Sequence, residues 1–326
     1  MQIRQIGPLR VSAIGLGCMG MTPVYGEPDQ DECIATLHRA IALGVSFIDT
    51  ADMYGAGHNE ELIGRFLKGR RDRIVLATKF GIVRQSAAYA RRIDNTPAYI
   101  RSACDASLRR LGVDTIDLYY MHRRNPEVPI AESVGAMAEL VKAGKVRSLG
   151  LSEVAVETLR AAHKVHPIAA VQSEYSLWTR GPEDGMLDAC RELGVTFVAY
   201  SPLGRALLTG KLASTDDLAP DDFRRHNPRF QGEAFAANKR LADGLAALAA
   251  ELKITPAQLA LAWQLGKHPH VVPIPGTRRA THLAENITAS EIALAPATIA
   301  RLDALFAPEA VAGERYVPEG MKGVNL

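Results

Sequence analysis

The feature that most constrains the fold is an alternation, repeated almost to the end of the chain, of short apolar runs with amphipathic helical segments. Most of these runs are continuously apolar, which is typical of parallel strands covered on both faces. The predicted strands are Ala13–Gly17, Ser46–Asp49, Ile74–Lys79, Asp117–Met121, Val146–Leu151, Ala170–Glu174, Thr196–Tyr200 and Val271–Ile274. Strands and helices that alternate in this way predict the α/β class and a single (β/α)8 TIM barrel.

The helical segments carry clear start and stop signals. Thr96 is a predicted N-cap, Pro97 suits the first helical position, and Gly112 ends that helix. Thr255 and Pro256 repeat the start signal later in the chain.

Three stretches lie outside the repeat. Gln2–Ile6 and Leu9–Ser12 flank a Gly-Pro pair and predict a hairpin within residues 1–12. Arg205–Gln231 predicts a long loop after strand seven, and Glu314–Leu326 predicts an irregular end to a tail of about 307–326. Since no linker-like composition interrupts the chain, residues 1–326 are expected to form one domain.

The composition argues against several classes of protein. Lys and Arg total 38 and Asp and Glu total 36, so the formal net charge of +2 does not suggest a nucleic-acid partner. The four cysteines form no CxxC pair, which favours free thiols over disulfides or a metal site. No signal peptide or membrane-spanning run is recognisable, so a cytoplasmic location without a membrane partner is expected. Nothing in the sequence indicates the oligomeric state.

One glycine motif invites a different prediction. Residues 15–20, Gly-Leu-Gly-Cys-Met-Gly, match the G-x-G-x-x-G pattern of a dinucleotide-binding turn. That mechanism requires a helix to begin inside the motif, with its N-terminus facing the phosphates. Here Pro23, Gly26 and Pro28 follow, and the helical pattern begins only near Asp31. A tight loop after the first strand is therefore the favoured interpretation.

Four polar residues follow the carboxyl ends of predicted strands, where a barrel of this kind places its active site. They are Asp49, Tyr54, Lys79 and His122. Taken singly, each has a structural explanation as a cap, a packed ring, a surface cation or a core histidine. Four such residues at one rim favour a catalytic group.

The chemistry of these residues fits together. Carbonyl reduction needs a proton donor, and a free phenol with a pKa of about 10 is a weak acid at neutral pH. The ammonium of Lys79 is expected to lower the pKa of Tyr54, and Asp49 to hold Lys79 charged and aimed. His122 is expected to orient the carbonyl oxygen or to share the proton.

These segments resemble the signatures of the aldo-keto reductases, most of all the bacterial and plant branch related to the potassium-channel beta subunits. The segments are residues 47–55 (Phe-Ile-Asp-Thr-Ala-Asp-Met-Tyr-Gly), 77–79 (Ala-Thr-Lys) and 120–122 (Tyr-Met-His). The resemblance extends from the N-terminal hairpin to about Asn286. It implies NADP(H) as cofactor, Tyr54 as general acid, Lys79 and Asp49 as its tuning pair, and His122 as the group that orients the carbonyl.

The resemblance also implies a cofactor-binding bed along the later strand ends. Ser152 and Gln172 correspond to ligands of the carboxamide, and Tyr200 to a ring stacked on the nicotinamide. Other segments correspond to the pyrophosphate and adenosine sites. The remaining residues implied to contact the cofactor are Met19, Glu153, Ser201, Pro202, Leu203, Arg205, Lys211, Gly276, Thr277, Arg278, His282, Glu285 and Asn286.

Three positions depart from the family pattern. Glu153 stands where many relatives have Asn, Gly276 where Lys is frequent, and His282 where Arg is frequent. The last two changes weaken the usual phosphate clamp, and Arg278 or Arg279 is the expected substitute.

The predicted function is NADP(H)-dependent reduction of small aldehydes or ketones. One alternative is a Schiff-base lyase that uses Lys79, although Asp49 favours the charged amine. Another is a cofactor-binding regulatory barrel with weak turnover. Met19, Met21, Tyr25, Trp178 and the C-terminal tail are candidate lining residues of a pocket whose substrate the sequence does not identify.

Overall fold

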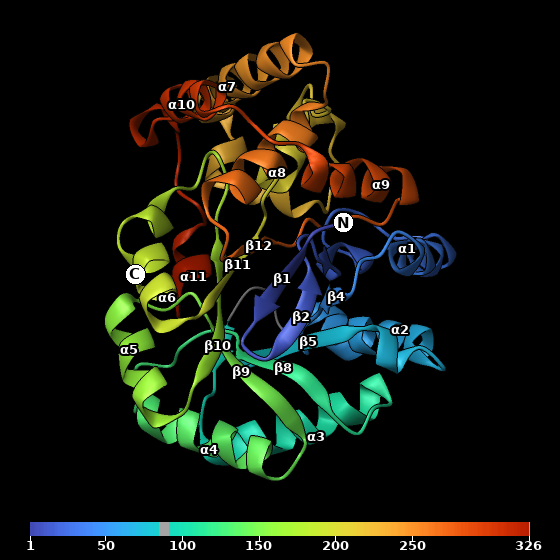
Figure 1. Cartoon of the computed structure of the whole chain (residues 1–326), viewed down its shortest axis with the longest axis vertical. Coiled ribbons are helices and arrows are strands. Elements are labelled where there is room, and N and C mark those ends of the chain that lie inside the picture. Colours follow the sequence, from blue (N-terminus) through green and yellow to red (C-terminus); the bar gives the residue numbers. More distant parts are fainter. Residues whose placement is uncertain (85–90, 326) are drawn as a thin grey trace.

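The computed structural model describes residues 1–84 and 91–325, and in them a parallel eight-stranded sheet curls into a barrel (Figure 1). Its strands, in spatial order, are β3 (Leu16–Gly17), β4 (Phe47–Asp49), β5 (Val75–Phe80), β8 (Ile116–Met121), β9 (Val146–Ser152), β10 (Ile168–Glu174), β11 (Thr196–Tyr200) and β12 (Val271–Pro273). The ends of the sheet meet through a parallel bridge between Gly17 and Gly276, and Gly15 N donates to Pro273 O at 3.0 Å. The predicted (β/α)8 barrel is confirmed.

Each predicted run overlaps one of these strands, but the first strand is much shorter than expected. Only Leu16–Gly17 pairs as a strand, whereas the sequence predicted Ala13–Gly17. The shortening falls where the barrel closes, and a Cβ at Gly15 would lie only 2.6 Å from the ring of Phe47. Close approach at the seam, rather than a regular ladder, determines the backbone there.

Helices surround the strands, and neighbours in the ring contact one another: α2 with α3, α3 with α4, α4 with α5, α8 with α9, and α9 with α1 (Figure 1). The helices are α1 (Gln30–Ala42), α2 (His58–Leu67), α3 (Pro97–Leu111), α4 (Ile130–Lys142), α5 (Val156–Val165), α6 (Met186–Leu193), α7 (Gly232–Glu251), α8 (Pro256–Lys267), α9 (Ala280–Thr288), α10 (Pro296–Leu305) and α11 (Pro318–Met321).

The predicted caps are present. The Thr96 side chain accepts a hydrogen bond from Tyr99 N, and Gly112 ends α3 with a φ of 64°. At the start of α8, Thr255 and Gln258 form a reciprocal capping box.

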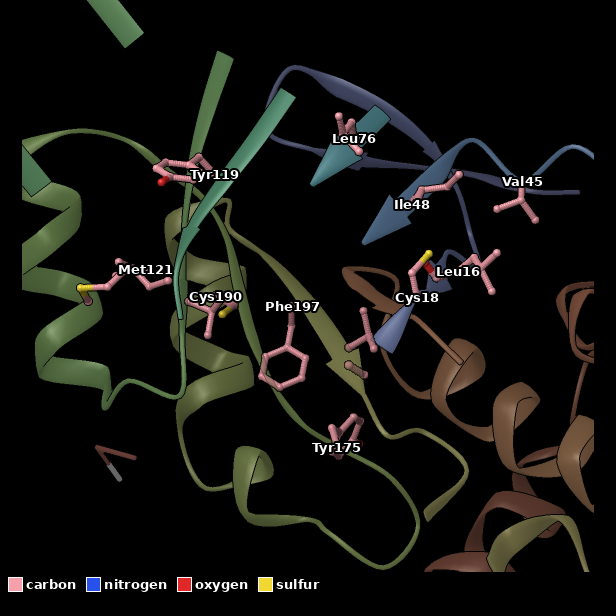
Figure 2. Close-up of a cluster of buried hydrophobic side chains, with 14 of the residues drawn as sticks. Leu16, Cys18, Val45, Ile48, Leu76, Tyr119, Met121, Tyr175, Cys190 and Phe197 are labelled. Carbon is pink, nitrogen blue, oxygen red and sulfur yellow. The ribbon is translucent and has the colours of Figure 1, made fainter. Parts of the chain in front are cut away.

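The side chains of the strands divide into two cores because they alternate between the faces of the sheet. Outward side chains pack against the helices, and Figure 2 shows part of this shell, with residues from β3, β4, β5, β8 and β11 and with Cys190 from α6. Inward side chains form a second cluster inside the barrel, which contains Phe47, Ala77, Leu118, Tyr120, Ala170, Val198 and Val272.

The predicted N-terminal hairpin is also present, as β1 (Ile3–Ile6) and β2 (Leu9–Ser12). Its apolar side chains Ile6, Leu9 and Val11 belong to the inner cluster. The hairpin therefore contributes to the barrel core at the end opposite the strand termini that carry the candidate site.

Other parts differ from the sequence-based expectation. A second hairpin, β6 (Ile82–Arg84) with β7 (Arg91–Ile93), was not predicted. The long loop is built of short 3-10 turns: Gly204–Thr209, Thr215–Asp217, Phe223–His226 and Pro228–Phe230. The tail is not wholly irregular, because Pro318–Met321 forms α11, whereas Leu326 lies outside the described residues.

In the described residues, no single helix has the length and apolar character needed to cross a membrane; only α7 and α8 taken together, with an 88° bend between them, do. The cytoplasmic location stays a prediction.

Candidate active site

The alternation of side chains along each strand explains which residues meet at the mouth of the barrel. Phe47, Ala77, Tyr120 and Ala170 point inward, so the residues two positions further along each chain also point inward. Those residues are Asp49, Lys79, His122 and Gln172. Parallel strands end at the same edge of a sheet, and these side chains therefore converge there.

Asp49 and Lys79 form a buried ion pair at the centre of this group. Lys79 Nζ contacts Asp49 Oδ1 and also donates to Thr50 O at 2.8 Å. The second carboxylate oxygen of Asp49 accepts a hydrogen bond from Gln172 Nε2 at 2.8 Å. Lys79 is 0 % exposed and Asp49 is 2 % exposed, so each charge depends on its partners rather than on water.

Tyr54 lies in the 3-10 turn Tyr54–Gly57 that follows β4. The Lys79 ammonium acts on its hydroxyl electrostatically, and Nζ lies 5.3 Å from the centroid of the phenol ring. The His122 ring stands edge-on to the same phenol, with centroids 5.9 Å apart and planes at 84°. The structure thus brings together the four residues that the sequence predicted as catalytic.

The pKa of Tyr54 differs from the expected direction. Burial of the phenol raises its pKa above the ordinary value, and this effect outweighs Lys79, which lowers the pKa as expected. Asp49 acts with burial, and the guanidinium of Arg123 acts with Lys79. Desolvation dominates because the phenolate loses more stabilisation on leaving water than it gains from the Lys79 ammonium, which is itself paired with Asp49. Tyr54 therefore holds its proton at neutral pH.

The pKa values of Asp49 and Lys79 are also shifted. Burial raises the pKa of Asp49, against the opposing effects of Lys79 and Gln172. For Lys79, burial lowers the pKa, but Asp49 and Tyr54 outweigh it and the net pKa is raised. Lys79 is consequently held as an ammonium ion.

The predicted carboxamide and ring-stacking residues lie along the neighbouring strand ends. Ser152 pairs with Gln172 in the sheet register, and Ser152 Oγ accepts a hydrogen bond from Arg123 Nη1 at 3.2 Å. Tyr200 ends β11, and its hydroxyl donates to Glu153 Oε1 at 2.8 Å. Met19 lies in the 3-10 turn Met19–Met21 that follows β3.

Glu153, identified from the sequence as a departure from the family pattern, is a buried hydrogen-bond acceptor. In addition to the Tyr200 hydroxyl, its Oε1 accepts from Glu174 N at 2.9 Å and from Arg315 Nη2 at 2.7 Å. Burial acts to raise the pKa of Glu153, but Arg315 and Arg123 outweigh it and the net pKa is lowered. Glu153 therefore serves as an anionic anchor for the C-terminal tail.

The tail crosses the barrel mouth, which the sequence did not specify. The hydroxyls of Tyr316 and Tyr200 lie 2.9 Å apart, and the Arg205 guanidinium lies 4.8 Å from the Tyr316 ring centroid. Further along, Asn325 Oδ1 accepts from Ala155 N at 3.2 Å and from Thr158 Oγ1 at 2.7 Å.

The predicted pyrophosphate loop has an unusual backbone. Ser201, Arg205 and Ala206 have φ values of 49°, 53° and 77°, in the left-handed region that non-glycine residues rarely adopt. Pro202 O accepts a hydrogen bond from Gln264, and Leu203 packs against the core. Such strained backbone is concentrated at functional sites, where surrounding contacts hold it in place.

Two predicted cofactor segments meet across the long loop. Lys211 Nζ lies 3.2 Å from Glu285 Oε2, which joins the expected pyrophosphate and adenine residues. His282, with a lowered pKa caused first by burial and then by Lys211 and Arg279, lies near both cations. Asn286 is buried on α9, one turn beyond His282.

The residues expected to bind the phosphate make different contacts in the structure. Gly276 closes the barrel, and a Cβ there would stand 3.2 Å from Gly17 O, so a longer side chain would require a small shift. Thr277 Oγ1 accepts from Arg279 N at 3.0 Å. Arg278 donates to the carbonyls of Gly26 and Glu27 at 3.1 and 3.2 Å, which leaves Arg279 as the exposed guanidinium at the start of α9.

Sequence reasoning missed Arg123, Glu174, Arg315 and Tyr316. Arg123 directly follows His122, and Glu174 points inward two residues after Gln172. The alternation of side chains at the strand ends could therefore have identified both. Arg315 and Tyr316 had no local signal, because their partners lie 162 and 116 residues away in sequence. Among the described residues, no group of three or more His, Cys, Asp or Glu side chains is arranged to hold a metal ion.

An eight-stranded barrel with a buried Asp-Lys-Tyr-His group at its carboxyl-terminal mouth defines a small class of barrel enzymes. Comparison with known sequences identifies it: residues 13–307 match the Aldo/keto reductase family, and the chain belongs to that family. It is therefore an oxidoreductase by family.

Individual relatives agree with this assignment. The chain is 46% identical over 320 residues to the aldo-keto reductase yakc of Schizosaccharomyces pombe, whose name includes NADP(+); the match covers 97% of this chain and 94% of the relative. Its fold is similar to that of a glycerol dehydrogenase from Gluconobacter oxydans, with 30% identity, a TM-score of 0.85 and 97% of each chain covered. An aldo/keto reductase from Klebsiella pneumoniae, solved with NADP and acetate, is 30% identical with a TM-score of 0.74, over 97% of this chain and 98% of that one.

Proposed function

We propose that the protein is an NADP(H)-dependent reductase of small aldehydes or ketones, with Tyr54 as the proton donor. The observation that carries the proposal is the buried chain of contacts from Gln172 through Asp49 and Lys79 to the hydroxyl of Tyr54. This series of contacts favours proton transfer from the phenol and stabilises the phenolate that remains.

The residues around the mouth fit NADP(H). Ser152 and Gln172 would hold the carboxamide, Tyr200 would lie against the nicotinamide, and the strained loop from Ser201 to Ala206 would face the pyrophosphate. When bound, the cofactor supplies the hydride. The cations Lys211 and Arg279, with the His282 ring beside them near the start of α9, favour a 2′-phosphate, and relatives named or solved with NADP support the same choice.

The chain's own residues account for the proton. Tyr54 keeps its proton at neutral pH because burial raises its pKa. As the carbonyl oxygen of a substrate gains negative charge, the hydroxyl proton of Tyr54 moves to that oxygen. The ammonium of Lys79 then lies beside the phenolate, and Asp49 keeps that ammonium charged. His122, edge-on to Tyr54, is placed to hold the carbonyl oxygen in line.

The test compares turnover with NADPH and NADH across a panel of aldehydes, for the native protein and for Tyr54→Phe. We expect Tyr54→Phe to lose about 10²- to 10⁴-fold in kcat while its Kd for NADPH stays the same. Tyr119→Phe is the matched control, because the hydroxyl of Tyr119 is buried on the outer face of β8 and has no hydrogen-bond partner in residues 1–84 and 91–325. Full activity in Tyr54→Phe, or equal losses in the two variants, would refute the role of Tyr54.

The Schiff-base alternative is disfavoured by the same contacts. A lysine nucleophile must lose its proton, whereas Asp49 and Tyr54 raise the pKa of Lys79. Borohydride trapping with an aldehyde is expected to leave Lys79 unmodified. The same turnover assay separates an enzyme from a regulatory barrel that only holds the cofactor.

A further inference from the structure

Among the described residues, Lys79, Arg123 and Arg229 are cationic residues less than a tenth exposed as whole residues, and the side chain of a fourth, Arg205, is 6 % exposed and lies 3.2 Å from Glu174. Lys79 contacts Asp49, and Arg229 lies 3.7 Å from Glu174. Within residues 1–84 and 91–325, Arg123 has no carboxylate within 4 Å. It is therefore the buried cation without a contacting carboxylate in the part of the chain that the structure describes.

Arg123 lies at the reacting end of the site. It follows His122 directly, and its Nη1 donates to His122 O at 2.7 Å and to Ser152 Oγ at 3.2 Å. Its Nε is buried and has no hydrogen-bond acceptor among the residues that the structure describes. The guanidinium is also near enough to the Tyr54 phenol for each to shift the pKa of the other.

The neighbouring carboxylate supplies only part of the missing charge, because Glu153 acts on Arg123 from beyond 4 Å and also pairs with Arg315 at 2.7 Å. Glu153 interacts with Arg123 only at longer range, and its Oε1 is already bonded to Arg315, Tyr200 and Glu174 N. A guanidinium cannot lose its proton to escape burial, and removing it from water without a counter-ion is costly. The N–H donors of a guanidinium match an oxyanion in geometry and in charge when some of them still lack an acceptor.

We propose that Arg123 is a specificity-determining residue that binds an anionic group of the substrate, so that the substrate is an aldehyde or ketone that also carries a carboxylate or a phosphate. This inference rests on the proposed reductase function and names its substrate class. The carboxamide of the cofactor is neutral and would not supply the missing charge. The pyrophosphate is expected at Arg205 and Lys211, on the long loop rather than beside His122.

The experiment uses pairs of substrates that differ in charge. 4-Oxobutanoate is compared with butanal, and glyceraldehyde 3-phosphate with glyceraldehyde, with the full-length protein and NADPH. Arg123→Met is expected to lower kcat/KM for an anionic member about 10- to 100-fold more than for its neutral partner, mostly through KM. The pair with the larger loss identifies carboxylate or phosphate as the group bound. Arg101→Met, which removes an exposed guanidinium paired with Glu139, is the matched control and should change neither pair.

Two further measurements keep the test decisive. Arg123→Lys keeps the charge without the fork and is expected to show a smaller difference between anionic and neutral substrates than Arg123→Met. If Arg123→Met does not fold, this variant carries the comparison. Equal losses on charged and neutral members, in whichever variant folds, would overturn the inference.

Calorimetry with butanoate, which has a carboxylate but no reducible carbonyl, tests the anion site without turnover. Binding to the NADPH-loaded protein should weaken at least about 10-fold in Arg123→Met. If no aldehyde is reduced but butanoate binding still depends on Arg123, the proposed function fails and the anion site stands. If butanoate binds the native protein and Arg123→Met alike, the anion site fails whatever the turnover.

Discussion

Replacing Lys79 with Met removes the ammonium that joins Asp49 to Tyr54 and leaves most of its aliphatic volume in place. The change leaves Asp49, 2 % exposed, with the amide of Gln172 as its remaining side-chain donor at 2.8 Å. Breaking a buried ion pair by removing one partner costs about 3–5 kcal/mol, because the other charge stays buried and unpaired. We expect Lys79→Met to lose that much of its free energy of unfolding at pH 7.

The loss in stability should depend on pH. Burial raises the pKa of Asp49, and removing the ammonium takes away the main opposing effect. A carboxyl whose folded pKa lies above its unfolded pKa of about 3.9 binds more protons in the folded state. Its stabilising effect is therefore present at low pH and is lost as the pH rises from about 4 toward the folded pKa. Lys79→Met should approach the native stability in acid and fall away from it as the pH rises.

The double variant Asp49→Asn with Lys79→Met separates stability from catalysis. Because it has no lone buried charge, its loss in free energy of unfolding should be smaller than the sum of the two single losses by about 2 kcal/mol or more. Its turnover should stay as low as that of Lys79→Met, down about 10²- to 10³-fold, because the phenolate of Tyr54 still lacks its ammonium.

Urea unfolding followed by the fluorescence of the buried Trp178 and Trp263 gives the free energies, and NADPH oxidation gives the rates. Three results would refute the reasoning: native stability in Lys79→Met at pH 7, strictly additive losses in the double variant, or recovered turnover in the double variant.

Three further changes test other parts of the structure. Gly150→Ala should cost about 1–3 kcal/mol in urea unfolding, because the new Cβ would lie 2.4 Å from the ring of Tyr120 inside the barrel. Burial, helped by the charge of a neighbouring glutamate, raises the pKa of Asp52 to about 8, so native stability should fall as the pH rises from about 4 to 8. Asp52→Asn should flatten that pH profile, and an unchanged slope in thermal unfolding would contradict the assignment. Glu153→Gln should loosen the C-terminal tail by weakening the contact with Arg315, which faster hydrogen exchange over residues 315–325 would reveal.

Much of the fold followed from short-range patterns. Continuous apolar runs marked the strands, and Thr96 and Thr255 marked helix starts that the structure confirms. The hairpin β6–β7 was missed because Ile82–Arg84 and Arg91–Ile93 are short and carry few of the apolar residues that mark a strand. The first strand was overextended because its ladder is interrupted where the barrel closes at Gly15.

The candidate site was predicted in part for the same reason. Asp49, Lys79 and His122 occupy fixed positions at strand ends, where alternation alone determines the face. The tail was a different matter, because no local pattern relates Arg315 to Glu153 or Tyr316 to Tyr200. Nor did the sequence indicate that Arg278 would bind the carbonyls of Gly26 and Glu27.

The sequence by itself determined the order of strands and helices and the identity of the polar residues at the strand ends, because both depend on neighbours a few positions apart. Only the tertiary structure decided how those residues behave. Burial raises the pKa of Tyr54 although Lys79 opposes it, and Arg123 is left without a carboxylate within 4 Å among the described residues. Desolvation and ion pairing depend on what the closed barrel and its tail bring near each charge, and those neighbours come from parts of the chain that are far apart in sequence.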